Sequence, residues 1–365
     1  MKNKILRSFV VMLAMAAFLT PLTAANKGQV IKNLRTYFNG LTQLGLFSGS
    51  VMVAQGGEVF LKDGFGTADY TTGRPNTQNT VYAIASTSKA FTAMSILILE
   101  ERGLLSVNDK VSDFVQGVPR GDEISIQQML NMSAGFYNFF NHPSLWDGSV
   151  SEYHTPEDVL QYFVDEPFVN EPGEAWSYCN SCYHLLGMVI EEASGMTYRD
   201  FIQQNILTPL KMNHTSYDPD SVEFNNLKAV GYDHVQTLPP PVSLFLHPTV
   251  AYSAGGMFST VTDMFKWNRA LTTDTLVSYE TLNKIFTPGL GNYGYGWYIE
   301  NHDVAGQQRQ LRWHWGSYLG YHSFIAWLPQ EDVYVHVILN FTSPDLADQY
   351  QLLPVVKAAA EMVLE

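Results

Sequence analysis

A serine and a lysine three residues apart precede the most apolar stretch of the chain. Ser86 and Lys89 stand just before residues 93–99, which are nearly all apolar. A helix that is apolar on almost every side is a buried one, and residues three apart in a helix share a face. We therefore expect a hydroxyl beside an amine at the buried start of a helix that ends at Gly103.

This pair predicts nucleophilic chemistry. A serine is a weak nucleophile until a neighbouring base takes its proton, and a lysine that burial keeps uncharged can be that base. Ser-x-x-Lys also occurs in chains without this chemistry, so further residues have to support it. The predicted reaction is attack by Ser86 on an acyl group, with Lys89 as base or proton partner.

Two further groups could complete such a site. Tyr178 and Asn180 follow a turn that begins at residue 172. A phenol near an amine can pass a proton, and an asparagine amide can hold a peptide group of the substrate. Asn180 also occupies a position that favours the start of a helix.

The last group lies at the end of a predicted strand. His314 precedes Gly316 and Ser317. A glycine in a strand allows close approach of another backbone. The N–H of Ser317 could then join the N–H of Ser86 as an oxyanion hole, an arrangement commonly worth about 3–4 kcal/mol at the transition state.

Strand patterns occur at both ends of the sequence, with helical patterns between them. The sequence predicts a first helix over 29–44, a hairpin of strands 47–54 and 58–62, strands over 296–299, 311–314, 321–327 and 333–339, and a last helix over 353–364. We predict a mixed α/β (α+β) fold: one antiparallel sheet built from both ends and flanked by the terminal helices, with a large, mostly helical lobe inserted.

The N-terminus has the features of a signal peptide. A basic head precedes an apolar centre over 9–19 that is too short for a stable membrane span, and small residues follow. We predict a signal peptide over 1–25, with an uncleaved anchor as the alternative, and a secreted domain over 26–365, periplasmic or extracellular. Its sheet lobe would comprise 26–85 and 255–365, and its helical lobe 86–254.

Composition excludes several classes of function. The chain has 365 residues, 46% of them hydrophobic, and a formal charge of −14, so it should repel nucleic acid and anionic lipid. Its two cysteines, Cys179 and Cys182, could form a disulfide in an exported protein or remain two buried thiols. They are too few for a zinc site, and no metal or cofactor is expected.

The sequence resembles the serine β-lactamase-related family, in the branch of class C β-lactamases, DD-peptidases, D-aminopeptidases and family VIII-type esterases. Three short motifs that occur in the family's order carry the resemblance: Ser86 with Lys89, Tyr178 with Asn180, and His314 with Gly316. Residues 64–69, 124–135 and 253–260 extend it. The resemblance implies a β-lactamase/transpeptidase-like fold. It also implies that Ser86 becomes acylated, that Lys89 and Tyr178 carry protons in an order left open, and that Asn180 holds the acyl-side amide.

His314 departs from the family pattern, which often has lysine there. A histidine with a pKa near 6.5 is mostly neutral at pH 7, so it should anchor a substrate carboxylate less well than lysine. This argues against an efficient β-lactamase and favours a peptidase, amidase or esterase. Tyr178 or His314 would assist deacylation, and a role for His314 in its charged form should appear as a change near its titration.

The predicted protein is an exported serine hydrolase that acts through an acyl-enzyme on a small-molecule, peptide, amide or ester substrate, with peptidoglycan-derived peptides among the candidates. The alternatives are a true β-lactamase and a catalytically idle penicillin- or peptidoglycan-binding module. Substrate stereochemistry and oligomeric state stay open.

Overall fold

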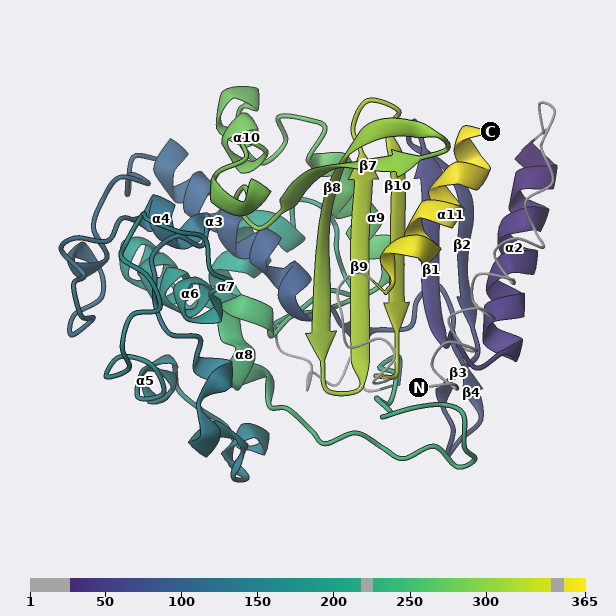
Figure 1. The fold of residues 1–365 in the computed structure, drawn as a ribbon, viewed down its shortest axis with the longest axis horizontal. Coiled ribbons are helices and arrows are strands. Elements are labelled where there is room, and N and C mark those ends of the chain that lie inside the picture. The colour runs from purple at the N-terminus through teal and green to yellow at the C-terminus, as the bar shows by residue number, and fades with distance from the viewer. Residues whose placement is uncertain (1–26, 218–225, 343–350) are drawn as a thin grey trace.

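The computed structural model describes residues 27–217, 226–342 and 351–365. Its centre is a six-stranded antiparallel sheet with the order β2-β1-β10-β9-β8-β7 (Figure 1). The strands are β1 (Gly49–Gln55), β2 (Glu58–Phe65), β7 (Tyr298–Val304), β8 (Gln307–Tyr318), β9 (Tyr321–Leu328) and β10 (Val333–Leu339). Both ends of the chain therefore contribute to one sheet, which confirms the predicted fold class.

Burial along the strands follows their order in the sheet. Every residue of β9 and β10 is buried, and so is all of β1 except its last residue. The edge strands β2 and β7 carry partly exposed residues along most of their length. Continuous apolar runs are thus found in the middle of the sheet and mixed sequences at its edges, as burial on two faces requires.

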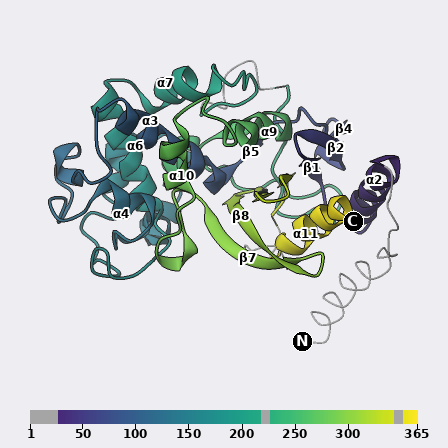
Figure 2. The same cartoon turned by 90° about the horizontal axis from the view of Figure 1, so that it is seen from above.

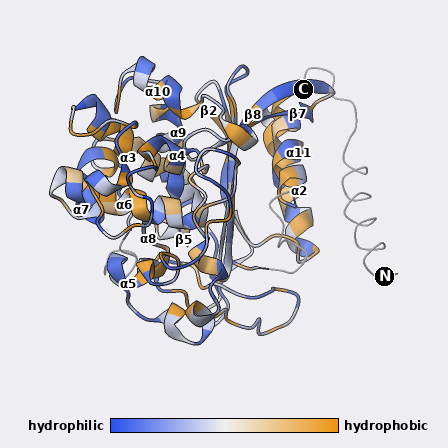
Figure 3. Cartoon of the chain, turned by 60° about the vertical axis from the view of Figure 1, so that its left-hand side comes forward, coloured by the Kyte–Doolittle hydropathy of each residue, from blue (hydrophilic) through white to orange (hydrophobic). Residues whose placement is uncertain are grey.

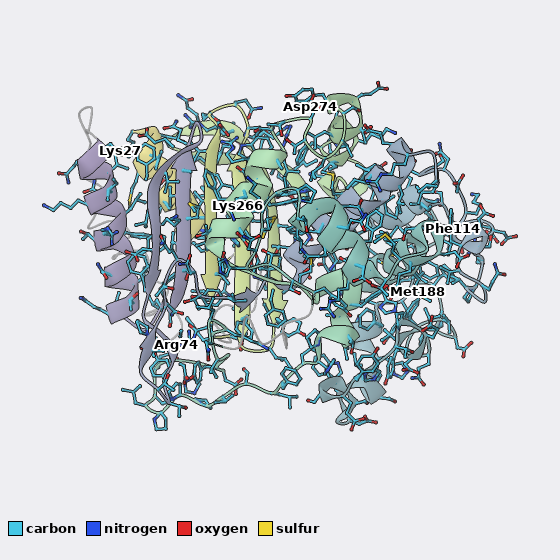
Figure 4. The ribbon with its side chains drawn as sticks, turned by 180° about the vertical axis from the view of Figure 1, so that it is seen from behind. Lys27, Arg74, Phe114, Met188, Lys266 and Asp274 are labelled. Carbon is cyan, nitrogen blue, oxygen red and sulfur yellow. A yellow bond between two sulfur atoms is a disulfide. The ribbon has the colours of Figure 1, made fainter. Side chains whose placement is uncertain are left out.

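Helices cover both faces of the sheet. The first and last described helices, α2 (Lys27–Gln43) and α11 (Leu353–Leu364), lie together on one side (Figures 1 and 3). On the opposite face α9 (Val261–Ala270), which carries Lys266, lies across the strands (Figure 4). In α2 the buried side chains recur every three or four residues, which gives the helix one apolar face toward the sheet.

The remaining helices gather beside β8, away from α2 and α11 (Figure 2). They are α3 (Lys89–Glu101), α4 (Ile126–Leu130), α5 (Pro156–Leu160), α6 (Asn180–Ser194), α7 (Tyr198–Ile202), α8 (Pro248–Gly255) and α10 (Tyr279–Ile285). Helix α3 is at the centre of this group, where it contacts α6, α7 and α8. It is buried on all sides from Lys89 to Leu99, as its apolar sequence predicts.

Short elements connect these layers. They are the strands β3 (Thr67–Asp69), β4 (Arg74–Pro75), β5 (Tyr82–Ala83) and β6 (Phe258–Ser259), the 3₁₀ turns η1 (Ala85–Ser88), η2 (Val111–Asp113), η3 (Phe139–Asn141), η4 (Pro143–Trp146), η5 (Ser149–Ser151) and η7 (Leu290–Asn292), and the π-helical turn η6 (Gln203–Leu207). The pair β5–β6 leads directly into η1, and so joins the sheet side of the molecule to α3.

Most predicted elements agree with the structure. The last helix has the predicted bounds, and Gly103 adopts a left-handed conformation just after α3, where it ends the helix. Strand β8 is longer than predicted. The two proposed lobes and their boundaries stay a prediction. The predicted signal peptide lies outside the described residues. No helix in the described ranges is long and apolar enough to cross a membrane.

Candidate active site

The turn η1 places Ser86 at the start of α3. Ala85, just before it, has a φ of 49°, which is uncommon for a residue other than glycine and concentrates at functional sites. Side chains of the turn satisfy its carbonyls: the Thr87 Oγ1 hydroxyl donates to the Ile84 oxygen and the Ser88 hydroxyl to the Ala85 oxygen, both at 2.6 Å. The backbone that carries Ser86 is therefore held from both sides.

Lys89 begins α3 and has no exposed surface. Its Nζ lies 3.1 Å from the Ser86 Oγ, 2.7 Å from the Asn180 Oδ1 and 2.6 Å from the Ala254 carbonyl oxygen. The predicted meeting of serine and lysine is thus confirmed, although a 3₁₀ turn produces it. In a 3₁₀ turn residues three apart are eclipsed, which brings the two side chains together.

The surroundings of Lys89 favour its neutral form. Burial holds the pKa of the amine well below its usual 10.5. The Asn180 and Ala254 oxygens can only accept hydrogen bonds, so they take the two N–H bonds of a neutral amine. In the neutral form the nitrogen's lone pair would be left for the hydroxyl of Ser86, 3.1 Å away.

Tyr178 approaches the same hydroxyl from the segment before α6. Its ring centroid is 5.0 Å from the Lys89 Nζ, and its phenol is close enough to the Ser86 side chain for Ser86 to affect its pKa. Burial raises the pKa of the phenol, and the proximity of Ser86 offsets part of that effect. The phenol therefore keeps its proton at neutral pH and can donate it.

Asn180 is the first residue of α6, which confirms the predicted helix start. Cys179 is the N-cap, and its sulfur accepts a hydrogen bond from the Cys182 N–H at 2.9 Å. The Asn180 Nδ2 donates to the Asn138 Oδ1 at 3.2 Å, which turns its Oδ1 toward Lys89. Asn138 was missed in the sequence because a lone asparagine in a loop carries no signal.

Cys179 and Cys182 form a disulfide across the first turn of α6. Of the two alternatives that the sequence left open, the structure has the bridge. Both cysteines are fully buried, and the bridge begins at the residue directly after Tyr178.

His314 lies on β8 with its ring buried near Tyr178. The Nδ1–H donates to the Trp315 carbonyl at 2.7 Å, and the Nε2 accepts from the Tyr293 hydroxyl at 3.0 Å. Burial, and secondarily the charge of Lys89, lowers the pKa of His314 to about 3. The predicted titration near neutral pH is therefore wrong. With both nitrogens engaged, the ring is also poorly placed to take a proton from water.

Gly316 lets β8 pass directly against the nucleophile turn. A Cβ at this position would lie 2.4 Å from the Ile84 oxygen and 3.0 Å from the Ser86 nitrogen, so no side chain fits there. Ser317 follows, exposed at the edge of a cavity. The close approach is the geometry that an oxyanion hole from Ser86 and Ser317 needs, and that role of Ser317 stays a prediction.

A cavity of about 720 Å³ opens above Ser86, within the usual size range of small-molecule sites. Tyr178, Asn180 and His314 line it together with Ser86. Aromatic rings form much of its wall, from Phe140, Trp146, Trp176, Tyr298, Trp315 and Tyr318. Among the described lining residues, the acidic side chain is that of Asp233, and burial lowers the pKa of the histidine His322 to about 4.

Two further contributors were missed in the sequence. Ala254 lies in the stretch 253–260 that carried the resemblance, but it acts through a carbonyl that any residue would supply. Tyr293 fixes the ring of His314. The available signal was the nearby Gly296: it has a φ of 78°, and a Cβ at this position would lie 2.9 Å from the backbone of Ala90, so residues 293–297 approach α3 closely.

Comparison with known proteins agrees with this geometry. The family described as Beta-lactamase matches residues 30–359. Penicillin-binding protein 4* of Bacillus subtilis (strain 168) is 32% identical over 309 residues, which cover 80% of this chain and 67% of that protein. Protein flp of Staphylococcus aureus (strain COL) is 28% identical over 311 residues, covering 80% of this chain and 59% of that protein.

Solved structures agree as well. The octameric penicillin-binding protein homologue from Pyrococcus abyssi has a TM-score of 0.78 at 27% identity, over 92% of this chain and 77% of that one. The D-amino acid amidase from Ochrobactrum anthropi SV3 has a TM-score of 0.79 at 21% identity, over 93% and 99%, a likeness of fold alone. The chain therefore belongs to the β-lactamase family and is a serine hydrolase of that family.

Proposed function

We propose that this chain is an exported hydrolase that forms an acyl-enzyme at Ser86 and cleaves a peptide, amide or ester. The observation that carries the proposal is the setting of Lys89. Two carbonyl oxygens, from Asn180 and Ala254, hold its N–H bonds while its nitrogen lies 3.1 Å from the Ser86 oxygen. This arrangement supports Lys89 as the group that takes the serine proton, an order that the sequence alone left open.

The first step follows from these contacts. The Ser86 oxygen attacks the carbonyl carbon as its proton passes to Lys89. Negative charge collects on the carbonyl oxygen, where the N–H groups of Ser86 and Ser317 would receive it. Tyr178, which burial keeps protonated beside Ser86, donates its proton to the leaving amine or alcohol. The Lys89 ammonium then returns a proton to the phenolate.

Deacylation uses the same groups in reverse. Water attacks the ester on Ser86, and a base must take one of its protons. His314 is bonded at both nitrogens, so Tyr178 with Lys89 is the better candidate. Asn180 would hold the acyl-side amide with the part of its amide group that Asn138 and Lys89 leave free.

The cavity supports substrates that need no carboxylate for binding. Its lining carries a carboxylate at Asp233 and histidines that burial keeps neutral, with the pKa of His314 lowered to about 3. An anionic substrate would lose hydration there without gaining an ion pair. Neutral or cationic amides, peptides and esters with an aromatic or bulky apolar group fit the aromatic wall better.

Export is part of the proposal on separate grounds. The first 25 residues have the pattern of a signal peptide. The Cys179–Cys182 disulfide supports it, because such bridges persist in oxidising compartments.

The test is labelling of the purified protein with a fluorophosphonate and with a labelled penicillin, followed by mass analysis of the peptide that contains Ser86. We expect an adduct at Ser86, its absence in Ser86→Ala, and turnover of p-nitrophenyl esters or D-amino-acid amides above nitrocefin. Acylation without turnover of any amide or ester would favour the binding module. Efficient nitrocefin hydrolysis would favour the β-lactamase. No adduct, with full ester turnover by Ser86→Ala, would refute the proposal.

A further inference from the structure

The segment that presents Tyr178 has little backbone support of its own. Ser177 is held by the bond from its N–H to the Met132 oxygen at 3.0 Å. In the described part of the chain, neither the N–H of Tyr178 nor that of Cys179 makes a backbone–backbone hydrogen bond. The phenol must nevertheless stay within hydrogen-bonding distance of Ser86. An interaction other than backbone hydrogen bonding therefore has to hold the phenol of Tyr178 in place.

The start of α6, by contrast, is firmly anchored. The Ser181 hydroxyl donates to the Tyr137 oxygen at 2.6 Å and accepts from the Phe139 N–H at 3.0 Å. The loop between those two partners carries Asn138, which orients Asn180. The first turn of α6 is thus a fixed point one residue away from the Tyr178–Cys179 segment.

The disulfide links the anchored turn to that segment. Cys182 lies within the first turn of α6, and Cys179 is the residue after Tyr178. Capping alone does not explain a cysteine at position 179. Its sulfur is a weak acceptor, and serine, threonine, aspartate or asparagine would cap the helix better.

We propose that the Cys179–Cys182 disulfide is a positioning element of the active site that holds the phenol of Tyr178 against Ser86. The proposal rests on the proposed acyl-transfer function, since its readout is the rate at which Ser86 is acylated. Because the bridge ties Cys179 covalently to the anchored first turn of α6, it also restricts the motion of the adjacent Tyr178 backbone. Without it, the phenol samples orientations from which it cannot deliver its proton.

The experiment compares Cys182→Ala, and Cys179→Ser combined with Cys182→Ala, with the wild type. The first variant breaks the bridge and keeps the sulfur cap, and the second replaces the cap with a better one. We expect both to acylate Ser86 on the order of ten- to a hundredfold more slowly, as small misplacements of catalytic groups do. KM for a p-nitrophenyl ester should change less than threefold.

A double-mutant comparison and a stability control separate positioning of the phenol from a general loss of stability. In a Tyr178→Phe background, breaking the bridge should cause little further loss of rate, because the group that the bridge positions is absent. Leu34→Ala, in α2 on the far face of the sheet, should lower thermal stability while leaving the acylation rate unchanged when assayed well below its unfolding temperature.

Several results would overturn the proposal. One is acylation of Ser86 at the wild-type rate in Cys182→Ala, and another is a wild-type rate in the variant that combines Cys179→Ser with Cys182→Ala. A third is that breaking the bridge lowers the acylation rate as much in the Tyr178→Phe background as in the wild type. The last is a fall in the acylation rate of Leu34→Ala as large as in the bridge variants. Failure of the proposed function is a separate outcome, because wild-type protein would then form no Ser86 adduct with either probe.

Discussion

At the scale of single residues, the proposed mechanism depends on one lysine that stays uncharged. Lys89 is buried among oxygen acceptors, and burial holds its pKa well below the usual value. A charged lysine would have no lone pair to offer Ser86. The position of Lys89 at the start of a wholly buried helix is what produces this state, and the sequence already indicates it through the apolar run that follows.

Replacing Lys89 by methionine tests this role. The side chain keeps a similar length but loses its basic nitrogen, so the acylation rate should fall by a factor of about 10²–10⁴, the usual contribution of a general base. Lys32→Ala, at an exposed position of α2, should keep the full rate. Intact-mass measurement of acylation by a fluorophosphonate gives both values. A Lys89→Met protein that acylates normally would assign the base to another group.

The identities of the main groups could be predicted, but their partners could not. Ser86, Lys89 and Tyr178 have reactive side chains, and the structure brings them together as expected. The Ala254 contact could not be predicted, because every residue type has a backbone carbonyl. The low pKa of His314 comes mainly from the burial of its ring, so a reference value near 6.5 was misleading.

At the scale of elements, the site is a junction between β8 and the turn η1. Gly316 permits this junction because its missing side chain makes room for the Ile84 carbonyl. The strand also presents His314 on the same side as the helices and carries Ser317 to the mouth of the cavity. Moving β8 outward by the width of a methyl group would separate the two proposed oxyanion donors.

Gly316→Ala therefore should reduce acylation by a factor of about 10²–10³, the usual cost of losing one oxyanion donor. The added Cβ would meet the Ile84 oxygen at 2.4 Å, which forces the strand away from the turn. Gly40→Ala is the matched control, since its Cβ meets nothing within 4 Å and alanine favours the helix α2. The control should retain full activity with equal or higher stability. Normal acylation by Gly316→Ala would show that the junction tolerates displacement.

Element bounds were predictable where the pattern was uniform. The last helix has an unbroken apolar face, and its bounds were predicted as observed. Strand β8 extends over residues 307–318, but its first residues are polar and Gly316 interrupts its end, so only 311–314 were predicted. Pairing with β7 and β9, which local sequence does not encode, sets its real length.

At the scale of the whole molecule, four of the buried histidines make stability depend on pH. Burial lowers the pKa of His314 and His336 to about 3, and of His184 and His322 to about 4. In the unfolded chain they titrate near 6.5, so below that pH the unfolded state binds more protons. The stability that neutral burial provides is therefore complete above about pH 6.5 and is lost as pH falls toward 3–4.

The free energy of unfolding should fall by up to about 1.4 kcal/mol per pH unit for each histidine below its unfolded pKa. Urea titrations at pH 7.5, 6.0 and 5.0 measure this directly. His336→Met, far from Ser86 on β10, should reduce the slope, since it removes one of the four groups. A free energy of unfolding that stays constant from pH 7.5 to 5.0 would contradict the neutral burial of these rings.

The pH dependence of Ser86 acylation tests the central claim most directly. Lys89 must be neutral and Tyr178 protonated, and burial lowers the first pKa and raises the second. The rate constant for labelling by a neutral fluorophosphonate should therefore rise with pH at the acid side and become level well below the usual lysine pKa of 10.5, because burial disfavours the charged amine. A rate that continues to rise tenfold per pH unit up to the usual lysine pKa of 10.5 would show an ordinary lysine at position 89 and contradict the account.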